Sequence, residues 1–375
     1  MADVDIRRAA YDDTLKTTIY TMLTAGGVGP IARGRVLLKP NLLLAAKPEQ
    51  AVTTHPQVVR AVVQFVRDHG GRPIIADSPA VGSMSRIGRR GGYREALKDL
   101  DVPFQAFDTE TTVDIGPPFR EVPLARQALE ADAVINLAKF KTHSQMTLTL
   151  GVKNTFGCVV GLKKPEWHMR AGRDKTLFAR LIVQIHQAIA PAFTLIDGIL
   201  GMDGDGPGKA GQPVPLGLLI GSRSAFAADH AACDLIGMPP EGLPTLAAAE
   251  TLGISHDPVR ITGDGPDRIA FTLPETGTTR FGPGWLQPLL RRHLLRRPVA
   301  DADKCRLCGE CWQYCPADAI QCRDDLLRFD YNRCIRCYCC IEVCPHGALT
   351  SADPLPARFL RGLWPGKEMR PGRPI

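Results

Sequence analysis

A cysteine pattern near the C-terminus constrains this chain more than any other feature of its sequence. Ten of the twelve cysteines fall between Cys305 and Cys344. A run of the form C-x2-C-x2-C-x3-C-P begins at Cys305 and recurs from Cys334. The acidic N-terminus (Met1-Ala2-Asp3-Val4-Asp5) is unlike a signal peptide, and no stretch has the roughly 18 uncharged apolar residues of a spanning helix. We therefore expect a cytoplasmic chain whose clustered thiols bind metal and do not form disulfides.

The duplicated run resembles the bacterial two-cluster ferredoxin domain at every ligand position. In such domains three closely spaced thiolates hold one cluster, and the fourth, before a proline, ligates the other. The resemblance implies two [4Fe-4S] clusters, one held by Cys305, Cys308, Cys311 and Cys344, the other by Cys334, Cys337, Cys340 and Cys315. Zinc is the alternative, although zinc sites use paired C-x2-C units with a longer spacer. Cys322 and Cys339 are left over as packed thiols, and Cys339 competes with Cys340 for its ligand position.

Basic residues are concentrated on either side of the cysteine runs. The net charge is +7, and residues 280–298 hold five arginines and no acid. The tail from Pro354 holds five further basic residues against Glu368. We expect four parts: an α/β domain at 1–280, a basic linker helix at 281–298, a two-cluster domain at 299–353 and a basic tail at 354–375.

The position of these basic segments indicates which classes of partner the protein could bind. A nucleic-acid-binding protein is usually basic over a structured face, so we do not expect nucleic acid. The linker and tail either pack across the joint between the domains or dock peripherally on an anionic membrane or an acidic partner.

The first 280 residues alternate apolar runs with helical stretches, which indicates an α/β domain with an open, mostly parallel sheet. The apolar runs at 36–38, 73–76, 133–137, 193–196 and 216–220 predict strands buried on both faces. Helices are predicted at 56–69, 177–190 and 225–236, each closed by glycine or proline. The cysteine region is expected to form a small α+β, ferredoxin-like (βαβ)2 domain.

Polar residues directly follow the predicted strands, where ligands of such sheets bind. We expect substrate to be bound by Lys39, Asn41, His55, Asp77, Lys139, Asn154 and Asp197. We expect the anion to be held and protons to be transferred by Lys141, His143, Lys153 and His168. Such a concentration predicts a pocket for a carboxylate or phosphate. The alternative is that the lysines are solvated and the histidines are packed.

A glycine-dense loop at 197–211 follows another predicted strand. Gly206, Gly208 and Gly211 satisfy G-x-G-x-x-G, but Pro213 and Pro215 forbid the helix that a dinucleotide fingerprint must open. We interpret the loop as a mobile active-site loop, with an inert surface turn as the alternative.

Several short segments, taken in order, resemble the DUF362 family over roughly residues 30 to 265. They are Lys39-Pro40-Asn41, Thr54-His55-Pro56, Asp77-Ser78-Pro79, Lys139-Phe140-Lys141-Thr142-His143, Gly151-Val152-Lys153-Asn154, Trp167-His168, Asp197-Gly198 and Gly206-Pro207. An attached two-cluster ferredoxin module is common in that family. The resemblance implies the domain boundary and the candidate positions, and it names no reaction.

The sequence favours an iron-sulfur oxidoreductase whose clusters exchange electrons with an anionic substrate in the α/β domain. A ferredoxin needs no partner domain of this size to carry electrons, and cofactors perform the difficult redox step while the protein orients the substrate. Two alternatives stay open: a non-catalytic electron-transfer subunit of a larger redox complex, and a cluster or metal assembly protein. The expected partner is a redox protein or a small anionic substrate.

Overall fold

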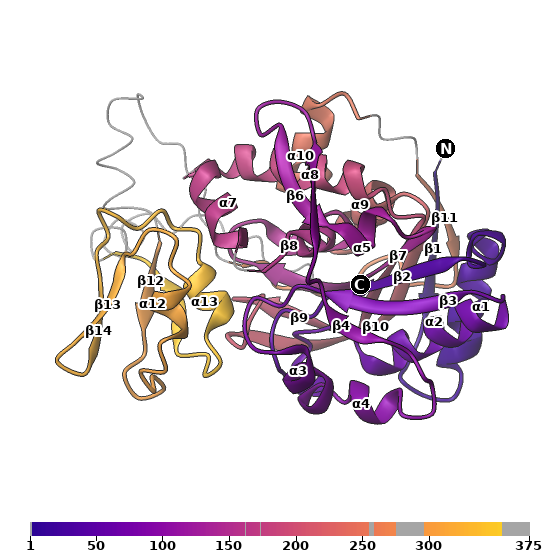
Figure 1. Ribbon diagram of the computed structural model, residues 1–375, viewed down its shortest axis with the longest axis horizontal. Helices are drawn as coiled ribbons and strands as arrows, with labels where there is room; N and C mark the ends of the chain where they lie inside the picture. The colour runs from indigo at the N-terminus through magenta and orange to yellow at the C-terminus, as the bar shows by residue number, and fades with distance from the viewer. Residues whose placement is uncertain (1, 162, 173, 255–258, 275–295, 355–375) are drawn as a thin grey trace, which may run out of the picture.

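A nine-stranded sheet forms the centre of the molecule (Figure 1). The computed structural model describes residues 2–161, 163–172, 174–254, 259–274 and 296–354. In spatial order the strands are β11 (Val259–Gly263), β1 (Ala2–Arg8), β10 (Gly211–Ser222), β9 (Phe193–Gly204), β7 (Ala133–His143), β2 (Arg35–Pro40), β3 (Arg72–Asp77) and β4 (Phe104–Ala106), and β8 (Thr147–Thr149) pairs with β7. Only β10 and β8 run antiparallel to their neighbours, so the sheet is mostly parallel, as predicted.

The strands form where the sequence is continuously apolar. All eleven residues of β7 are buried, because helices cover both faces of the sheet. Each of the five predicted apolar runs lies inside a strand: 36–38 in β2, 73–76 in β3, 133–137 in β7, 193–196 in β9 and 216–220 in β10.

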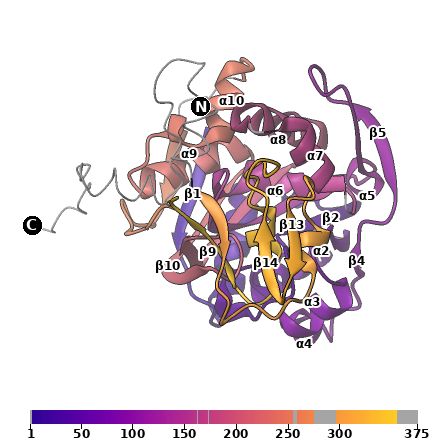
Figure 2. The ribbon, with the colours of Figure 1, turned by 90° about the vertical axis from the view of Figure 1, so that its left-hand side faces the viewer.

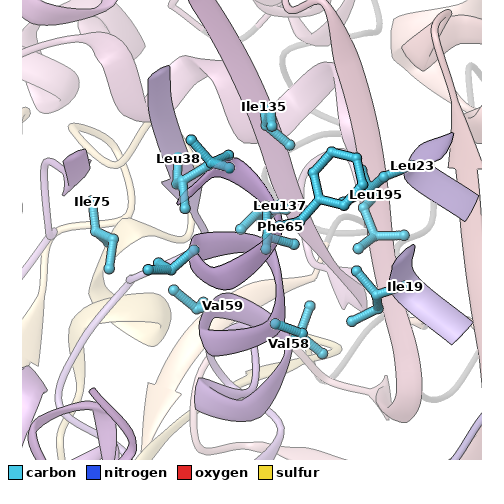
Figure 3. Packing of buried hydrophobic residues seen from close by; sticks show 14 of the residues in the cluster. Ile19, Leu23, Leu38, Val58, Val59, Phe65, Ile75, Ile135, Leu137 and Leu195 are labelled. Atoms are coloured by element: carbon cyan, nitrogen blue, oxygen red, sulfur yellow. The ribbon is translucent and has the colours of Figure 1, made fainter. Parts of the chain in front are cut away.

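Helices cover the two faces of the sheet with separate apolar clusters. On one face lie α1 (Leu15–Ala25), α2 (Pro56–Asp68), α3 (Met84–Arg90) and α4 (Tyr93–Ala96). There Ile19, Val58 and Phe65 pack on Leu38, Ile135, Leu137 and Leu195 of the sheet (Figure 3). On the other face lie α8 (Lys175–Ile189), α9 (Ala225–Leu235) and α10 (Pro244–Thr251). The three predicted helices are therefore α2, α8 and α9.

Short elements complete the large region. They are the hairpin β5 (Glu110–Asp114) and β6 (Glu121–Ala125), the helices α5 (Arg126–Leu129), α6 (Gly151–Asn154) and α7 (Lys163–Ala171), and 3-10 turns at Gly29–Ile31, Pro48–Gln50, Thr155–Cys158 and Pro240–Gly242. Because α6 and α7 follow the carboxyl end of β7 and of β8, they bring Lys153 and His168 to that edge of the sheet.

The cysteine region folds as two βαβ units. The first is β12 (Arg297–Ala300), α12 (Glu310–Gln313) and β13 (Ile320–Arg323), and the second is β14 (Leu326–Phe329), α13 (Cys339–Val343) and β15 (Leu349–Ala352). The units interlock, since β12 pairs with β15 and β13 with β14. In Figures 1 and 2 this region packs at the edge of the sheet where β7 and β9 end. We refer to residues 296–354 as the cysteine domain.

The domain boundaries stay a proposal. Most of the predicted linker helix, at 281–295, and nearly all of the basic tail, at 355–375, lie outside the described residues. The last residues of the predicted linker, Arg297 and Pro298, open strand β12 and are not helical.

The glycine-dense segment at 197–211 is mostly strand, because residues 197–204 lie in β9 and Gly211 opens β10. The remaining residues, 205–210, form the tip of the β9–β10 hairpin, which packs against the cysteine domain. Lys209 Nζ donates to the carbonyl of Pro345 over 2.7 Å. A Cβ atom at Gly208 would lie 2.9 Å from the carbonyl oxygen of Glu342, so this close approach requires glycine. The loop is therefore shorter than predicted, and its tip contacts a region distant in sequence.

Candidate functional site

Two lysines at strand ends are neutralised by aspartates inside the protein. Lys39 Nζ lies 2.7 Å from Asp77 Oδ1, and Lys139 Nζ lies 2.7 Å from Asp197 Oδ2. All four side chains are buried. These residues were predicted to follow strands, but they lie within β2, β3, β7 and β9. Because a buried charge is costly without a partner, each lysine is paired with an aspartate of a neighbouring strand.

The Lys139–Asp197 pair belongs to a closed network. Tyr11 donates to Asp197 Oδ1 over 2.7 Å, and the backbone N–H of His55 donates to Asp197 Oδ2 over 2.8 Å. The His55 ring stacks on Tyr11 with centroids 3.6 Å apart. Burial lowers the pKa of His55 to about 4, so the ring is neutral. This network orders the start of α2.

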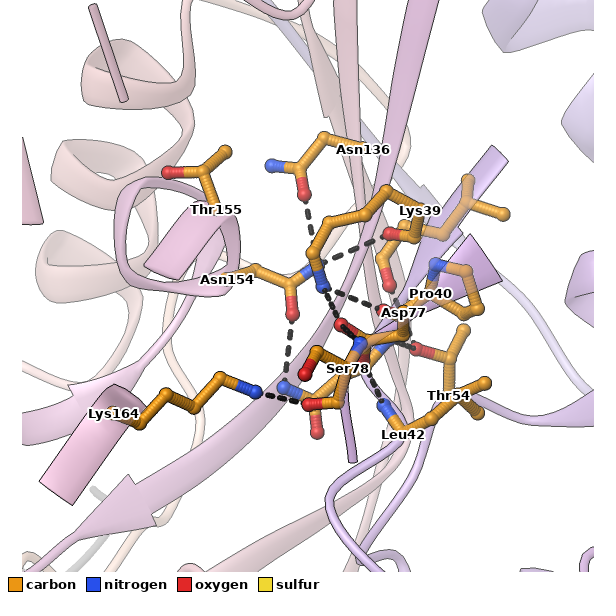
Figure 4. Close-up of polar contacts among 12 residues, drawn as sticks. Lys39, Pro40, Leu42, Thr54, Asp77, Ser78, Asn136, Asn154, Thr155 and Lys164 are labelled. Carbon is orange, nitrogen blue, oxygen red and sulfur yellow. Dashed lines mark hydrogen bonds and ion pairs between the residues drawn. The ribbon is translucent and has the colours of Figure 1, made fainter. Parts of the chain in front are cut away.

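A chain of amides connects β2, β7 and α6 beside the first pair (Figure 4). Asn41 Nδ2 donates to Asn154 Oδ1, and Asn154 Nδ2 donates to Asn136 Oδ1. Lys141 Nζ donates to Asn41 Oδ1 over 2.8 Å and to the Val52 carbonyl over 2.6 Å. Lys141 therefore positions Asn41 and is fully engaged within the protein.

His143 connects the large sheet to the cysteine domain. Its Nδ1 accepts from the backbone N–H groups of Gln145 and Met146, which leaves the proton of the neutral ring on Nε2. That atom lies 2.8 Å from Glu342 Oε1 of α13. Burial lowers the pKa of His143 to about 4. The contact thus joins a neutral imidazole to a carboxylate that lies between Cys340 and Cys344.

One pocket is lined by both regions. The sheet and its helices contribute Lys39, Asn41, Asp77, Ser78, Thr149, Lys153, Asn154, Phe156, Gly157, Lys164 and His168, together with Leu42, Leu43 and Ala80. The cysteine domain contributes Tyr314, Cys339 and Glu342. We call this cavity the interdomain pocket. The pocket extends to the Lys39–Asp77 ion pair because residue 157 is glycine: a Cβ atom there would lie 2.5 Å from Lys39 Nζ.

Three cationic or potentially cationic groups of this pocket are not used in ion pairs. Within the described residues, the half-buried Lys153 has no hydrogen bond or ion pair, and burial lowers its pKa. Lys164 donates only to the Ser78 carbonyl, and burial lowers its pKa to about 8. His168 is buried with no partner at Nδ1, and burial lowers its pKa to about 3. At neutral pH the pocket therefore offers the Lys164 ammonium and the neutral His168 imidazole, with the unpaired amino group of Lys153 beside them.

The predicted cluster ligands fit a metal cluster by their chemistry and their placement. Cys305, Cys308, Cys311 and Cys344 line one pocket of the cysteine domain, which is the crossed set of one run's first three cysteines and the other run's last. Burial raises the pKa of the Cys311 thiol to about 12, and the neighbouring Cys344, Cys308 and Cys305 add to this shift. Burial raises the pKa of Cys340 likewise, and Cys337, Cys334 and Cys315 are among its neighbours. Close, buried thiols of this kind suit a metal that binds them as thiolates.

The structure brings together some of the predicted substrate-site residues and separates others. Lys39, Asn41, Asp77, Lys153, Asn154 and His168 line the interdomain pocket. His55, Lys139 and Asp197 form the network at Tyr11, while Lys141 and His143 lie between that network and the pocket, engaged with Asn41 and Glu342.

Sequence reasoning assigned no role to Tyr11, Lys164, Tyr314 or Glu342. Lys164 lies three residues before Trp167-His168, which the sequence did single out. Tyr314 directly precedes Cys315, and Glu342 lies two residues from both Cys340 and Cys344, where the repeat drew attention to the thiols alone. No local signal marks Tyr11.

Among the helices that the structure describes, none is both long and apolar enough to cross a membrane.

Comparisons with known proteins agree with this division of the chain. A family model described as a domain of unknown function, DUF362, matches residues 36–234, and a 4Fe-4S dicluster domain matches residues 297–345. A thylakoid-associated protein of Synechocystis sp. is 40% identical over 261 residues, which are 68% of this chain and 81% of that protein.

Other relatives match the cysteine domain alone. Pyruvate synthase subunit PorD of Methanocaldococcus jannaschii is 41% identical over 56 residues, 14% of this chain and 64% of that protein. Hydrogenase-4 component A of Escherichia coli is 41% identical over 54 residues, 14% of this chain and 26% of that protein. The chain thus spans less than two thirds of either redox subunit.

Among solved structures, the lactate racemase apoprotein from Thermoanaerobacterium thermosaccharolyticum superposes with a TM-score of 0.39 at 11% identity, covering 60% of this chain and 55% of that one. A similarity of this size carries no weight for fold or function.

Proposed function

Because this chain belongs to the DUF362 family and ends in a 4Fe-4S domain of electron-transfer type, we propose that it is an iron-sulfur oxidoreductase. The proposed substrate is a small carboxylate or phosphate bound in the interdomain pocket. Two [4Fe-4S] clusters would exchange electrons with this substrate.

One observation carries this proposal: the interdomain pocket is lined by polar residues of the sheet and by the cysteine domain itself. Cys339, which lines the pocket, stands between Cys337 and Cys340, two of the proposed ligands of one cluster. A substrate held by Lys153 would therefore lie next to a redox centre.

The eight thiols named above would hold the two clusters in the crossed arrangement. The clusters supply electron transfer when bound, with potentials set by hydrogen bonding, charge and exposure around them. The chain's own residues supply binding and protons. The Lys153 side chain has no partner within the described residues. An anion beside it would favour its ammonium form, and charged hydrogen bonds of this type contribute roughly 1.5–3 kcal/mol.

Lys164 is the proposed proton donor, since a group with a pKa near the working pH is the most effective general acid and burial brings its pKa to about 8. His168 is neutral, and its unpartnered Nδ1 is available to accept a hydrogen bond or a proton. His143 and Lys141 become positioning residues in this proposal, because they hold Glu342 and Asn41 at the pocket wall.

The second candidate is a non-catalytic electron-transfer subunit. It is favoured by the relatives of the cysteine domain, which are subunits of pyruvate synthase and of a hydrogenase. In this case the protein would turn over no small molecule by itself.

A two-step experiment separates the two candidates. Anaerobically purified protein is first screened by thermal shift against small carboxylates and phosphates. The best ligand is then added to dithionite-reduced protein, and reoxidation is followed by visible absorbance. An oxidoreductase that reduces the ligand is reoxidised by it. Lys153→Met should weaken ligand binding by about 1.5–3 kcal/mol.

Lys98→Met is the matched control, because Lys98 forms an exposed pair with Glu95 outside the pocket. If ligand binding is equal in wild type and Lys153→Met, the pocket assignment is wrong. Tight binding without reoxidation would favour the subunit.

A further inference from the structure

A second groove lies on the outer side of the cysteine domain, against α3 and the β9–β10 tip. It is lined by Leu44, Ala45, Val81, Gly82, Arg86, Arg90, Lys209, Cys308, Glu310, Val343, Pro345 and His346. It shares none of these residues with the interdomain pocket. We call it the basic groove.

The groove is rich in cationic groups that lack acidic partners. The side chains of Arg86 and Arg90 are exposed and make no ion pair or hydrogen bond within the described residues. Lys209 is close enough to both arginines that they help lower its pKa, after the larger effect of burial. Glu310 is the single acid among the lining residues.

Some arginines elsewhere in the described part of the chain are paired with aspartate: Arg60 contacts Asp99, and the exposed Arg260 lies 2.7 Å from Asp3. Arg90 lies in the last turn of α3, where a cation also stabilises the helix dipole, so its position has an explanation within the fold. Lys209 donates to the Pro345 carbonyl, which is uncharged, and the Arg86 side chain has no partner within the described residues. The groove therefore carries positive charge that no acidic side chain of the described residues neutralises by an ion pair.

The same groove contains the most accessible of the proposed cluster ligands. Cys308 is exposed, whereas Cys311 and Cys344 of the same set are buried, as are Cys337 and Cys340 of the other set. One set of thiols thus reaches the surface at the basic groove, and the other adjoins the interdomain pocket through Cys339. The two openings of the cysteine domain are lined by different residues.

We propose that the basic groove is the docking site of a small acidic electron-carrier protein of the ferredoxin class. This inference rests on the proposed redox function of the cysteine domain. Positive charge around an accessible redox centre steers an acidic protein into productive encounters and raises its association rate. Each encounter transfers one electron: the carrier is oxidised by one electron and this protein is reduced by one, with no bond made or broken.

Charge reversal in the groove tests the proposal. The variant Arg86→Glu/Arg90→Glu is compared with wild type and with Arg33→Glu, which changes an exposed arginine near the opposite, amino end of β2. The probe is a reduced, acidic plant-type [2Fe-2S] ferredoxin. Its binding is measured by calorimetry at low and high salt, and its oxidation by stopped-flow absorbance.

We expect wild type and Arg33→Glu to bind the probe at low salt, with binding lost at high salt. In the double variant the association rate at low salt should fall about tenfold or more. Reduction by dithionite and iron content should be unchanged in all three proteins, which separates a docking defect from cluster loss.

Absence of salt-sensitive binding by wild type would overturn the proposal, as would equal binding by the double variant. Flotation with anionic vesicles is run in parallel, and groove-dependent binding to vesicles without binding to ferredoxin would overturn it in favour of a membrane surface. These assays contain no small substrate, so their failure is distinct from a failure of the interdomain pocket.

Discussion

The large sheet region and the cysteine domain are held together by different interactions. The sheet buries three extended apolar clusters against helices on both faces. The core of the cysteine domain is small and consists in large part of the proposed ligands Cys311, Cys340 and Cys344, packed with Ile341 and Leu349. A region of this size is only marginally stabilised by apolar burial. Burial of apolar side chains therefore stabilises the sheet region, whereas we expect the cysteine domain to need bound metal in order to stay folded.

Removal of iron should produce the largest difference in stability between the two regions. Chelation under oxidising conditions should unfold residues 296–354 and leave the sheet region folded, because metal binding supplies the folding free energy of small metal domains. Limited proteolysis with mass spectrometry should show new cleavage within 296–354 and continued protection of the sheet. Equal protection of both regions after complete iron loss would contradict the account.

Cys315→Ala should remove one cluster and leave the other in place. Wild type should contain about eight iron atoms and eight sulfides, on the two-cluster ligand count. The variant should lose about half of them, specifically from the set with Cys334, Cys337 and Cys340, because the fourth cysteine ligates the other run's cluster. Iron and sulfide analysis measures the content, and Cys322→Ala is the control because Cys322 is exposed and outside both sets. A full complement of iron in Cys315→Ala would contradict the assignment of Cys315 to the cluster of Cys334, Cys337 and Cys340.

Lys39→Met should destabilise the sheet region while sparing the cysteine domain. The substitution leaves Asp77 buried without its cation, and breaking a buried pair costs about 3–5 kcal/mol. Lys98→Met is the matched control, because its pair with Glu95 is exposed and such pairs contribute little. Urea denaturation followed by far-UV circular dichroism gives the free energies of unfolding. Equal stability of the two variants would show that the Lys39–Asp77 pair is dispensable.

The pH dependence of ligand binding should distinguish the pocket from the rest of the sheet region. Lys164 has a folded pKa of about 8, lowered by burial from 10.5, so its ammonium is present below that pH and lost above it. Affinity for an anion should therefore fall as the pH rises through about 8. Between about pH 8 and 10.5 Lys164 is protonated in the unfolded chain but largely neutral in the folded protein. The free energy of unfolding should therefore increase as the pH rises through this range. Lys164→Met should flatten the binding profile; an unchanged profile would assign the pH dependence to another group.

Much of the fold could be predicted from local sequence. The apolar runs that became β2, β3, β7 and β9 are long enough to be recognised by themselves, and the cysteine repeat specified two βαβ units. The site was predictable only at the level of the sheet edge. Lys39 and Asp77 were both expected in the substrate site because each directly follows a predicted strand, but nothing local shows that they form a buried ion pair.

The rest of the site depends on contacts between distant parts of the chain. Glu342 meets His143 across about two hundred residues of sequence, and the burial that lowers the pKa of Lys153 and Lys164 arises only after the domains pack. The close approach of Gly208 to α13 could not be predicted for the same reason, since α13 is distant from it in sequence.

The central claim is that the interdomain pocket and one cluster form a single redox unit, and a redox titration of Lys153→Met monitored by electron paramagnetic resonance tests it most directly. Cys339 is among the groups that influence the pKa of Lys153, so removing this positive charge should disfavour the added electron. The potential of the cluster assigned to Cys334, Cys337, Cys340 and Cys315 should fall by an amount on the order of tens of millivolts, while that of the other cluster changes less. Identical potentials in wild type and Lys153→Met, or equal shifts in both clusters, would contradict the account.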